Sequence, residues 1–284
     1  MLTTNKKILD EAYYHRYAVG AFNAPNLEIA TAIIEAAVEL KSPVIVEASK
    51  KEMHHAGAEY LAAIVRKAAE KYKIPISMHL DHGDSYETAV EAIEAGFTSV
   101  HFDGSALPFI ENLRITKKVV AYAHKHGVSV EGEVGKVLTP SFQGQDSNKK
   151  DFFTDPEQAK QFINETKIDS LAISIGTSHG AYKGDTNLDI DRLGKINQLC
   201  HIPLVLHGGS MVPYDQLKQA IFNGIAKVNI NTELRLAFSN TIRDRLEKDP
   251  AEYVPYNFLG AAKIEVRKVA EDKIQEFGSE GKAK

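Results

Sequence analysis

The sequence predicts an α/β fold, a single-domain (β/α)8 TIM barrel over residues 1–284, on three observations. The chain has 284 residues, a length that one barrel domain can occupy. Short apolar, β-rich runs alternate eight times with amphipathic stretches, which is the pattern of parallel strands joined by crossover helices. The competing open, doubly wound sheet lacks its glycine signature, because no G-x-G-x-x-G follows the first apolar run, where the turn is GAFNAPN.

The eight apolar runs predict the strands, in chain order. They are Tyr17–Phe22, Pro43–Ala48, Pro75–Leu80, Ser99–Phe102, Ser129–Val134, Ser170–Ile175, Pro203–Leu206 and Ala226–Ile230. The stretches that follow them have apolar residues at helical spacing. They predict helices over Leu27–Leu40, Ala58–Lys71, Tyr86–Ala95, Ile110–His124, Pro156–Glu165, Ile190–Leu199, Asp215–Asn223 and Glu233–Glu247.

Two segments fall outside this repeat. Thr139–Lys150 is polar and contains Pro and Gly, so a long mobile loop is expected at about 136–150, after the fifth strand. A C-terminal helical extension is expected from about residue 258.

Composition excludes several classes of function. Lys and Arg number 34 against 38 Asp and Glu, so no basic excess points to nucleic acid or an anionic membrane as a partner. The first residues lack the apolar core of a signal peptide, and no later run is apolar enough to span a bilayer, so we expect a cytoplasmic protein. Cys200 is the only cysteine, so any metal must be held by His and carboxylate side chains.

Every predicted strand ends in polar residues, and the strand ends are where barrels carry their chemistry. These residues are Asn23, Ser49, Asp81 with His82, Asp103, Glu133, His179 with Gly180, His207 with Gly208, Gly209 and Ser210, and Asn229, Ile230, Asn231 and Thr232. Polar residues are common in loops, but a histidine at three separate strand ends is less expected. A functional site at this end of the barrel is therefore favoured.

Three of these residues, His82, His179 and His207, predict a metal site. A lone histidine after a strand is more often a hydrogen-bonded turn residue, but three imidazoles that converge from different strands form the ligand set of a catalytic zinc site. Two other histidines are weaker candidates: His79 precedes the strand end, and His101 lies within the fourth strand.

The turns after the last two strands predict a phosphate site. LHGGS and VNINT offer backbone amides and hydroxyls where barrels often bind phosphate, and Gly208 and Gly209 let the backbone approach an anion closely, with Ser210 as a donor. A metal beside a phosphate site indicates a phosphorylated substrate, with Asp81 available as the acid/base.

Seven motifs, in order along essentially the whole chain, resemble the class II, metal-dependent ketose-bisphosphate aldolases, the family of fructose-1,6-bisphosphate and tagatose-1,6-bisphosphate aldolases. They are HLDHG (79–83), FDGS (102–105), VEGEVG (130–135), GTSHGAYKG (176–184), VLHGGS (205–210), KVNINTEL (227–234) and EFGSEGKA (276–283). The resemblance implies cleavage of a ketose 1,6-bisphosphate, most simply fructose 1,6-bisphosphate, to dihydroxyacetone phosphate and glyceraldehyde 3-phosphate. It also implies a homodimer or homotetramer.

The same resemblance implies a role for each residue of the site. A zinc-type ion would bind His82, His179 and His207, and Asp81 would exchange the proton of the C4 oxygen. Asp103 and Glu133 would offer a second divalent position, and a monovalent cation is also implied. The dihydroxyacetone phosphate segment would comprise Gly180, Gly208, Gly209, Ser210, Asn229, Ile230, Asn231 and Thr232, while Asn23 and Ser49 would line the substrate pocket.

Two departures from the family pattern leave the substrate open. The loop KVLTPSFQGQD has Asp146 as its one carboxylate, and Tyr256 replaces an arginine near the distal phosphate, for which Lys263 or Arg267 could compensate. Alternative interpretations are a tagatose-1,6-bisphosphate or 6-phospho-5-dehydro-2-deoxygluconate aldolase, a non-catalytic aldolase-like subunit, and a metal-dependent hydrolase. A lysine Schiff base is disfavoured, because Lys227 lies near the start of its strand.

Overall fold

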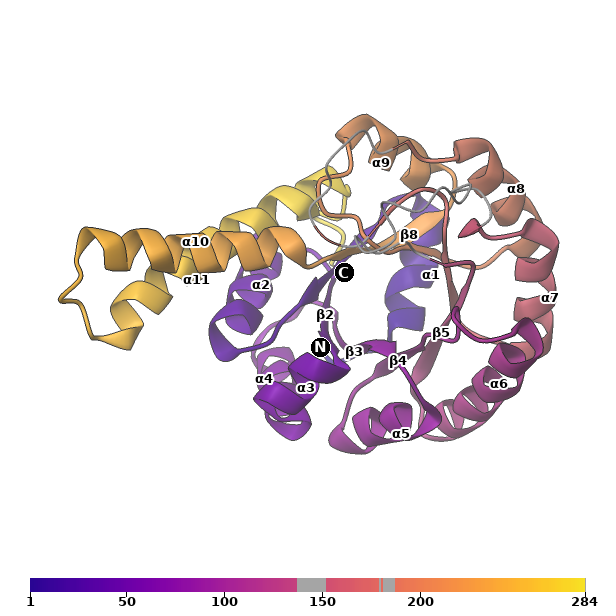
Figure 1. The fold of residues 1–284 in the computed structure, drawn as a ribbon, viewed down its shortest axis with the longest axis horizontal. Coiled ribbons are helices and arrows are strands. Elements are labelled where there is room, and N and C mark those ends of the chain that lie inside the picture. Colours follow the sequence, from indigo (N-terminus) through magenta and orange to yellow (C-terminus); the bar gives the residue numbers. More distant parts are fainter. Residues whose placement is uncertain (137–151, 179, 181–186, 284) are drawn as a thin grey trace.

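The fold is a closed barrel of eight parallel strands in sequential order, which confirms the predicted TIM barrel (Figure 1). The computed structural model describes residues 1–136, 152–178, 180 and 187–283. The expected loop at about 136–150, with Asp146, therefore lies outside the described residues apart from Lys136, and so does the candidate ligand His179.

The strands agree with the predicted runs to within about two residues at most ends. They are β1 (Val19–Asn23), β2 (Val44–Ser49), β3 (Ile76–Gly83), β4 (Ser99–Phe102), β5 (Ser129–Val134), β6 (Ser170–Ile173), β7 (Leu204–Leu206) and β8 (Ile225–Ile230). β3 ends three residues later than predicted, because it continues through Asp81 and His82 to Gly83. Those two residues therefore belong to the strand and not to the turn after it.

Helices cover the outside of the barrel, and their apolar faces pack on the strands to form the main core. They are α2 (Leu27–Glu39), α4 (Ala58–Lys71), α5 (Tyr86–Ala95), α6 (Phe109–Lys125), α7 (Pro156–Thr166), α8 (Ile190–Cys200) and α9 (Tyr214–Phe222). The helix after the eighth strand, α10 (Thr232–Lys248), projects from the barrel. Side-chain caps fix several helix starts; the side chain of Asn26 accepts a hydrogen bond from the Ile29 amide at α2. No helix in the described ranges is long and apolar enough to cross a membrane.

One additional helix, α1 (Asn5–His15), closes the N-terminal end of the barrel. Its buried residues Ile8, Leu9 and Ala12 pack with Val19 and Ala226, which lie near the starts of their strands, in a small separate core. Because this end is closed, the opposite end, formed by the carboxyl ends of the strands, is available for a functional site.

The C-terminal part of the chain forms an arm beside the barrel. α10 and α11 (Pro255–Glu276) run side by side and project from it, with α11 packed along α2 (Figure 1). Another short helix, α3 (Lys50–Ala56), directly follows β2. α10 fully buries only Leu234; one side of it packs on α11, and the rest of its surface is exposed in the described chain.

Candidate active site

Most of the predicted site residues line one pocket at the carboxyl ends of the strands. The described lining residues are Asn23, Asp81, His82, Gly180, His207, Gly208, Ser210, Asn229, Asn231 and Thr232. A larger groove between α4 and α5, which includes Tyr60, Tyr86 and Glu91, lies on the outer surface and contains none of the candidate site residues. The smaller pocket is therefore the candidate active site.

Asp81 is held as a carboxylate by two amide donors. The Asn23 Nδ2 donates to Asp81 Oδ2 and the Asn229 Nδ2 donates to Asp81 Oδ1, each at 3.1 Å. Burial by itself would raise the pKa of Asp81, but the summed attraction of His82, His207 and Lys227 holds this pKa well below its usual range. Asp81 is therefore ionised and oriented, and it can accept a proton.

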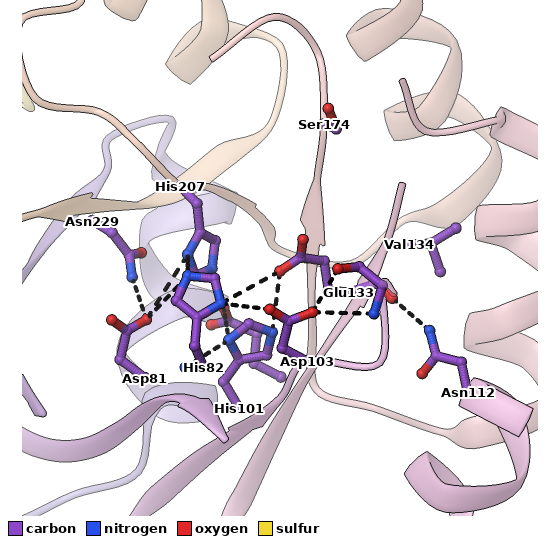
Figure 2. Close-up of polar contacts among 12 residues, drawn as sticks. Asp81, His82, His101, Asp103, Asn112, Glu133, Val134, Ser174, His207 and Asn229 are labelled. Carbon is purple, nitrogen blue, oxygen red and sulfur yellow. Dashed lines mark hydrogen bonds and ion pairs between the residues drawn. The ribbon is translucent and has the colours of Figure 1, made fainter. Parts of the chain in front are cut away.

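His82 and His207 point one ring nitrogen at each other (Figure 2), and each points its other ring nitrogen at a carboxylate. His82 Nδ1 lies 2.8 Å from Asp103 Oδ2, and His207 Nε2 lies 2.8 Å from Glu131 Oε1. The two remaining nitrogens, His82 Nε2 and His207 Nδ1, are 3.0 Å apart. A carboxylate behind each imidazole is the arrangement that orients histidine ligands of metal ions.

The electrostatics of this histidine pair fit a cation between the two rings. Burial opposes a charge on His82, but the attraction of Asp81 and the hydrogen bond to Asp103 raise its pKa to about 10. Burial, together with repulsion by His82, lowers the pKa of His207 to about 3. These pKa shifts favour one shared proton between His82 Nε2 and His207 Nδ1. A divalent cation bound to both nitrogens would replace this proton.

Among the residues that the structure describes, two groups could hold a metal ion. Asp81, His82, His101 and His207 offer ligand atoms within 4.8 Å of one another, and so do His82, Asp103 and Glu133. The first group contains two of the three predicted histidines, and the second contains both predicted acidic residues. His101, which the sequence disfavours because it lies within a strand, is fully buried at this site.

Buried charges also lie beneath the pocket. The Lys227 Nζ donates to Glu131 Oε2 at 2.8 Å and to His79 Nε2 at 3.2 Å, and it lies 3.6 Å from Glu47 Oε2. These four side chains are fully buried. The sequence signal for them is the alternation of side chains along a strand, because His79 lies two residues before Asp81 and Lys227 two residues before Asn229.

Several other residues singled out from the sequence lie outside the pocket lining. Ser49 caps α3 through a capping box with Glu52, and Glu52 also accepts a hydrogen bond from Asn23. The Gly209 amide donates to the Asn229 carbonyl. Ile230 is fully buried in the core. Lys263 pairs with Glu35 and Arg267 with Glu271, and none of these four residues lines the pocket.

Two asparagine oxygens, Asn229 Oδ1 and Asn231 Oδ1, are buried without a hydrogen-bond partner among the described residues. Both residues line the pocket. Unpaired buried polar atoms are unusual in folded proteins. A polar ligand or a water that donates hydrogen bonds in the pocket would satisfy both oxygens.

In sequence and in fold the chain is similar to known aldolases. The family model for "Fructose-bisphosphate aldolase class-II" matches residues 3–282. The chain is 42% identical to a fructose-bisphosphate aldolase of Thermus caldophilus, over all of both chains, and 40% identical to a sulfofructosephosphate aldolase of Alkalicoccus urumqiensis, over 99% of this chain and 98% of the relative. The crystal structure of the YdjI aldolase from Escherichia coli K12 superimposes with a TM-score of 0.89 at 33% identity, covering all of both chains.

Proposed function

Because the chain belongs to the class II fructose-bisphosphate aldolase family and is therefore a lyase, we propose that it reversibly cleaves a ketose 1,6-bisphosphate to dihydroxyacetone phosphate and an aldehyde phosphate. Fructose 1,6-bisphosphate is the first candidate substrate. The observation that carries the proposal is the carboxylate of Asp81 beside two imidazoles: Asp81 Oδ1 lies 3.8 Å from His82 Nε2 and 3.9 Å from His207 Nδ1.

Asp81 is the proposed acid/base. Cleavage of the C3–C4 bond requires removal of the C4 hydroxyl proton, and the ionised Asp81 accepts it and returns it in the condensation direction. The amides of Asn23 and Asn229 keep both carboxylate oxygens in place, so the carboxylate needs no reorientation before proton transfer.

His82, His179 and His207 are the proposed ligands of a zinc-type ion. When bound, such an ion supplies a Lewis acid that draws electron density from the substrate carbonyl. Asp103 and Glu131 face His82 Nδ1 and His207 Nε2, so loss of the proton held between the two rings would leave lone pairs on His82 Nε2 and His207 Nδ1 for the ion. Asp103 and Glu133, with His82, are proposed to offer a second divalent position.

The substrate phosphate of the dihydroxyacetone half is proposed to lie at the turns after β6, β7 and β8. Gly180, Gly208, Ser210, Asn229, Asn231 and Thr232 line the pocket there. Gly209 and Ile230 belong to the same two segments of the chain. Asn23 is proposed to line the rest of the substrate pocket, with Ser49 at its edge. A monovalent cation near this phosphate is part of the same proposal.

The candidate substrates differ mainly in the half of the sugar that leaves as the aldehyde. Relatives of 42% and 40% identity are named for fructose bisphosphate and for sulfofructose phosphate, so overall identity does not choose the substrate. Tagatose 1,6-bisphosphate and 6-phospho-5-dehydro-2-deoxygluconate are the alternatives we retain. A cleavage assay on these sugars with added zinc, cobalt or manganese separates them, and no cleavage of any would favour a non-catalytic subunit.

We also propose a homodimer or homotetramer in the cytoplasm. On the arm, Tyr253, Tyr256 and Ile264 expose 85%, 78% and 57% of their surface, and their position on one projecting arm supports contact with a second copy. The single cysteine suits a reducing compartment.

The proposed roles of Asp81 and His207 are tested by a pair of variants. Asp81→Ala is expected to keep its bound metal and to lower kcat by about 10²- to 10⁴-fold, because it removes the acid/base alone. His207→Ala is expected to lower both metal content and kcat, since it removes a ligand. Elemental analysis and steady-state kinetics measure the two effects, and the reverse pattern would contradict the assigned roles.

A further inference from the structure

β3 contains a bulge at the two residues that the proposed function needs most. Leu80 pairs with Val100 and Gly83 with Phe102, so three steps along β3 match two steps along β4. The extra residue falls at Asp81–His82, and His82 has a left-handed backbone with φ of 49°. Bulges commonly redirect a side chain next to an active site.

This bulge explains how two consecutive residues serve one pocket. In a regular strand, successive side chains point to opposite faces, so only one of Asp81 and His82 could face the mouth of the barrel. Both line the pocket. The left-handed backbone of His82 is therefore the local feature on which the aim of its imidazole depends, and for a residue other than glycine this conformation is unfavourable unless its surroundings hold it.

Side chains of β4 and of the residue after it hold the left-handed backbone and the ring of His82. The amide of His82 donates to His101 Nδ1 at 3.2 Å, while His82 Nδ1 meets Asp103 Oδ2 (Figure 2). Two residues of one segment thus fix the backbone and the ring of His82. The bulge then closes where the Asp103 amide donates to the Gly83 carbonyl at 2.9 Å.

Gly83 is part of the same arrangement. A Cβ at position 83 would lie 2.6 Å from the carbonyl oxygen of His101, so a side chain there would push β3 away from β4. The close approach of the two strands keeps His101 within reach of the His82 amide.

The hydrogen bonding of His101 separates it from the proposed ligands. Because its Nδ1 accepts from a backbone amide, the neutral ring carries its proton on Nε2, which faces Glu133 Oε2 at 3.4 Å. Neither ring nitrogen then has a lone pair free for a metal ion, although His101 lies within 4.8 Å of the other candidate ligand atoms. Its ring also packs 5.0 Å from the rings of His82 and of His207.

We propose that His101 is a positioning residue: its Nδ1 holds the bulged backbone of His82 in the left-handed conformation and so aims the His82 imidazole at the metal and at Asp81. This inference rests on the proposed function, in which His82 is a ligand, but its structural part concerns the backbone of His82 alone.

Three substitutions test the acceptor atom. His101→Asn places an amide oxygen close to the position of Nδ1, His101→Gln places one near the position of Nε2, and His101→Leu removes the acceptor. The Asn variant is expected to bind Co²⁺ within about threefold of wild type, and the Gln and Leu variants to bind it about 10- to 100-fold more weakly, the usual effect of losing a group that orients a ligand. Chelator competition and the Co²⁺ absorption spectrum measure this, with thermal unfolding as the check on folding.

Crystal structures of the metal-free wild type and of the Asn and Gln variants complete the test. The proposal expects a positive φ at residue 82 in wild type and Asn, and a changed φ or a rotated imidazole in Gln. Equal Co²⁺ affinity in all variants, or an unchanged His82 in the Gln variant, would overturn it. If wild type binds Co²⁺ but cleaves no sugar phosphate, the proposed function fails while the positioning role is still decided by these structures.

Discussion

Glu131 contacts both a buried lysine and a proposed metal ligand beneath the pocket. It accepts hydrogen bonds from Lys227 and from His207, and all three side chains are almost completely inaccessible to solvent. Burial by itself would raise the pKa of Glu131, but Lys227 and the hydrogen bond to His207 hold this pKa well below its usual value. One carboxylate therefore balances a buried lysine and orients a proposed metal ligand.

Glu131→Gln tests this dual role. The amide keeps the shape of the side chain but leaves the Lys227 ammonium without its closest counter-charge, so the free energy of unfolding is expected to fall by about 3 kcal/mol, as for other broken buried pairs. Urea denaturation of the metal-free protein measures the loss. Glu165→Gln is the matched control, because Glu165 pairs with Lys117 at the exposed surface and should leave stability near wild type. Equal stability of the two variants would contradict the prediction.

At the level of single residues, the sequence predicts the proposed acid/base and metal ligands better than it predicts the buried residues that hydrogen-bond to them. Asp81, His82 and His207 follow from the barrel rule that strand ends carry chemistry. His101 and Glu131 lie within strands, where an apolar interior is the usual expectation. Alternation along β4 and β5 puts their side chains on the same face as the strand-end residues, but only the three-dimensional register shows which of these residues meet. The bulge at His82 has no signal in the sequence that alternation alone could detect.

Among the elements, the turn after β7 is held in a narrow space. Gly208 has φ of 64°, and a Cβ there would lie 2.4 Å from the carbonyl oxygen of Ser178, in the segment after β6. The close approach of these two turns brings together the segments at which the phosphate site is proposed.

Gly208→Ala is therefore expected to destabilise the protein by about 1–2 kcal/mol or more, since the left-handed backbone and the clash both oppose an alanine. It is also expected to raise the KM for the sugar phosphate. Gly260→Ala is the control: Gly260 lies in α11, a Cβ added there would meet nothing within 4 Å, and alanine is expected to add roughly 0.5–1 kcal/mol through helix propensity. Thermal unfolding and steady-state kinetics measure both variants. A Gly208→Ala protein as stable as Gly260→Ala would refute the role of the turn.

Element positions were predictable wherever the repeat is regular. The predicted and observed strands share their centres, because each is a short β-rich run between helical stretches. α1 and α3 lie outside the eight-fold alternation, so the repeat assigns them no place. α3 in particular buries only Glu52 and Met53, too few positions to give an amphipathic pattern.

For the whole molecule, barrel closure determines which distant segments share the site. β3 and β7 contribute His82 and His207, 125 positions apart in the chain, and β1 and β8 contribute the two asparagines that hold Asp81. Length and alternation were enough to predict this convergence, since an eight-stranded parallel barrel brings every strand end to one rim. Contacts between copies of the chain have no comparable pattern in the sequence.

Because the proposed metal site joins strands from opposite parts of the barrel, metal binding should stabilise the whole fold. An ion present at about 1,000 times its Kd adds about 4 kcal/mol to the folded state, which corresponds to a rise in Tm of roughly 8 °C for a chain of this size. Thermal unfolding of metal-stripped protein with and without zinc, at one protein concentration, measures the shift. His207→Ala should lose it, whereas His124→Ala, which removes a histidine paired with Asp169 on the surface, should keep it. A zinc-dependent shift of equal size in His207→Ala would place the stabilising ion elsewhere.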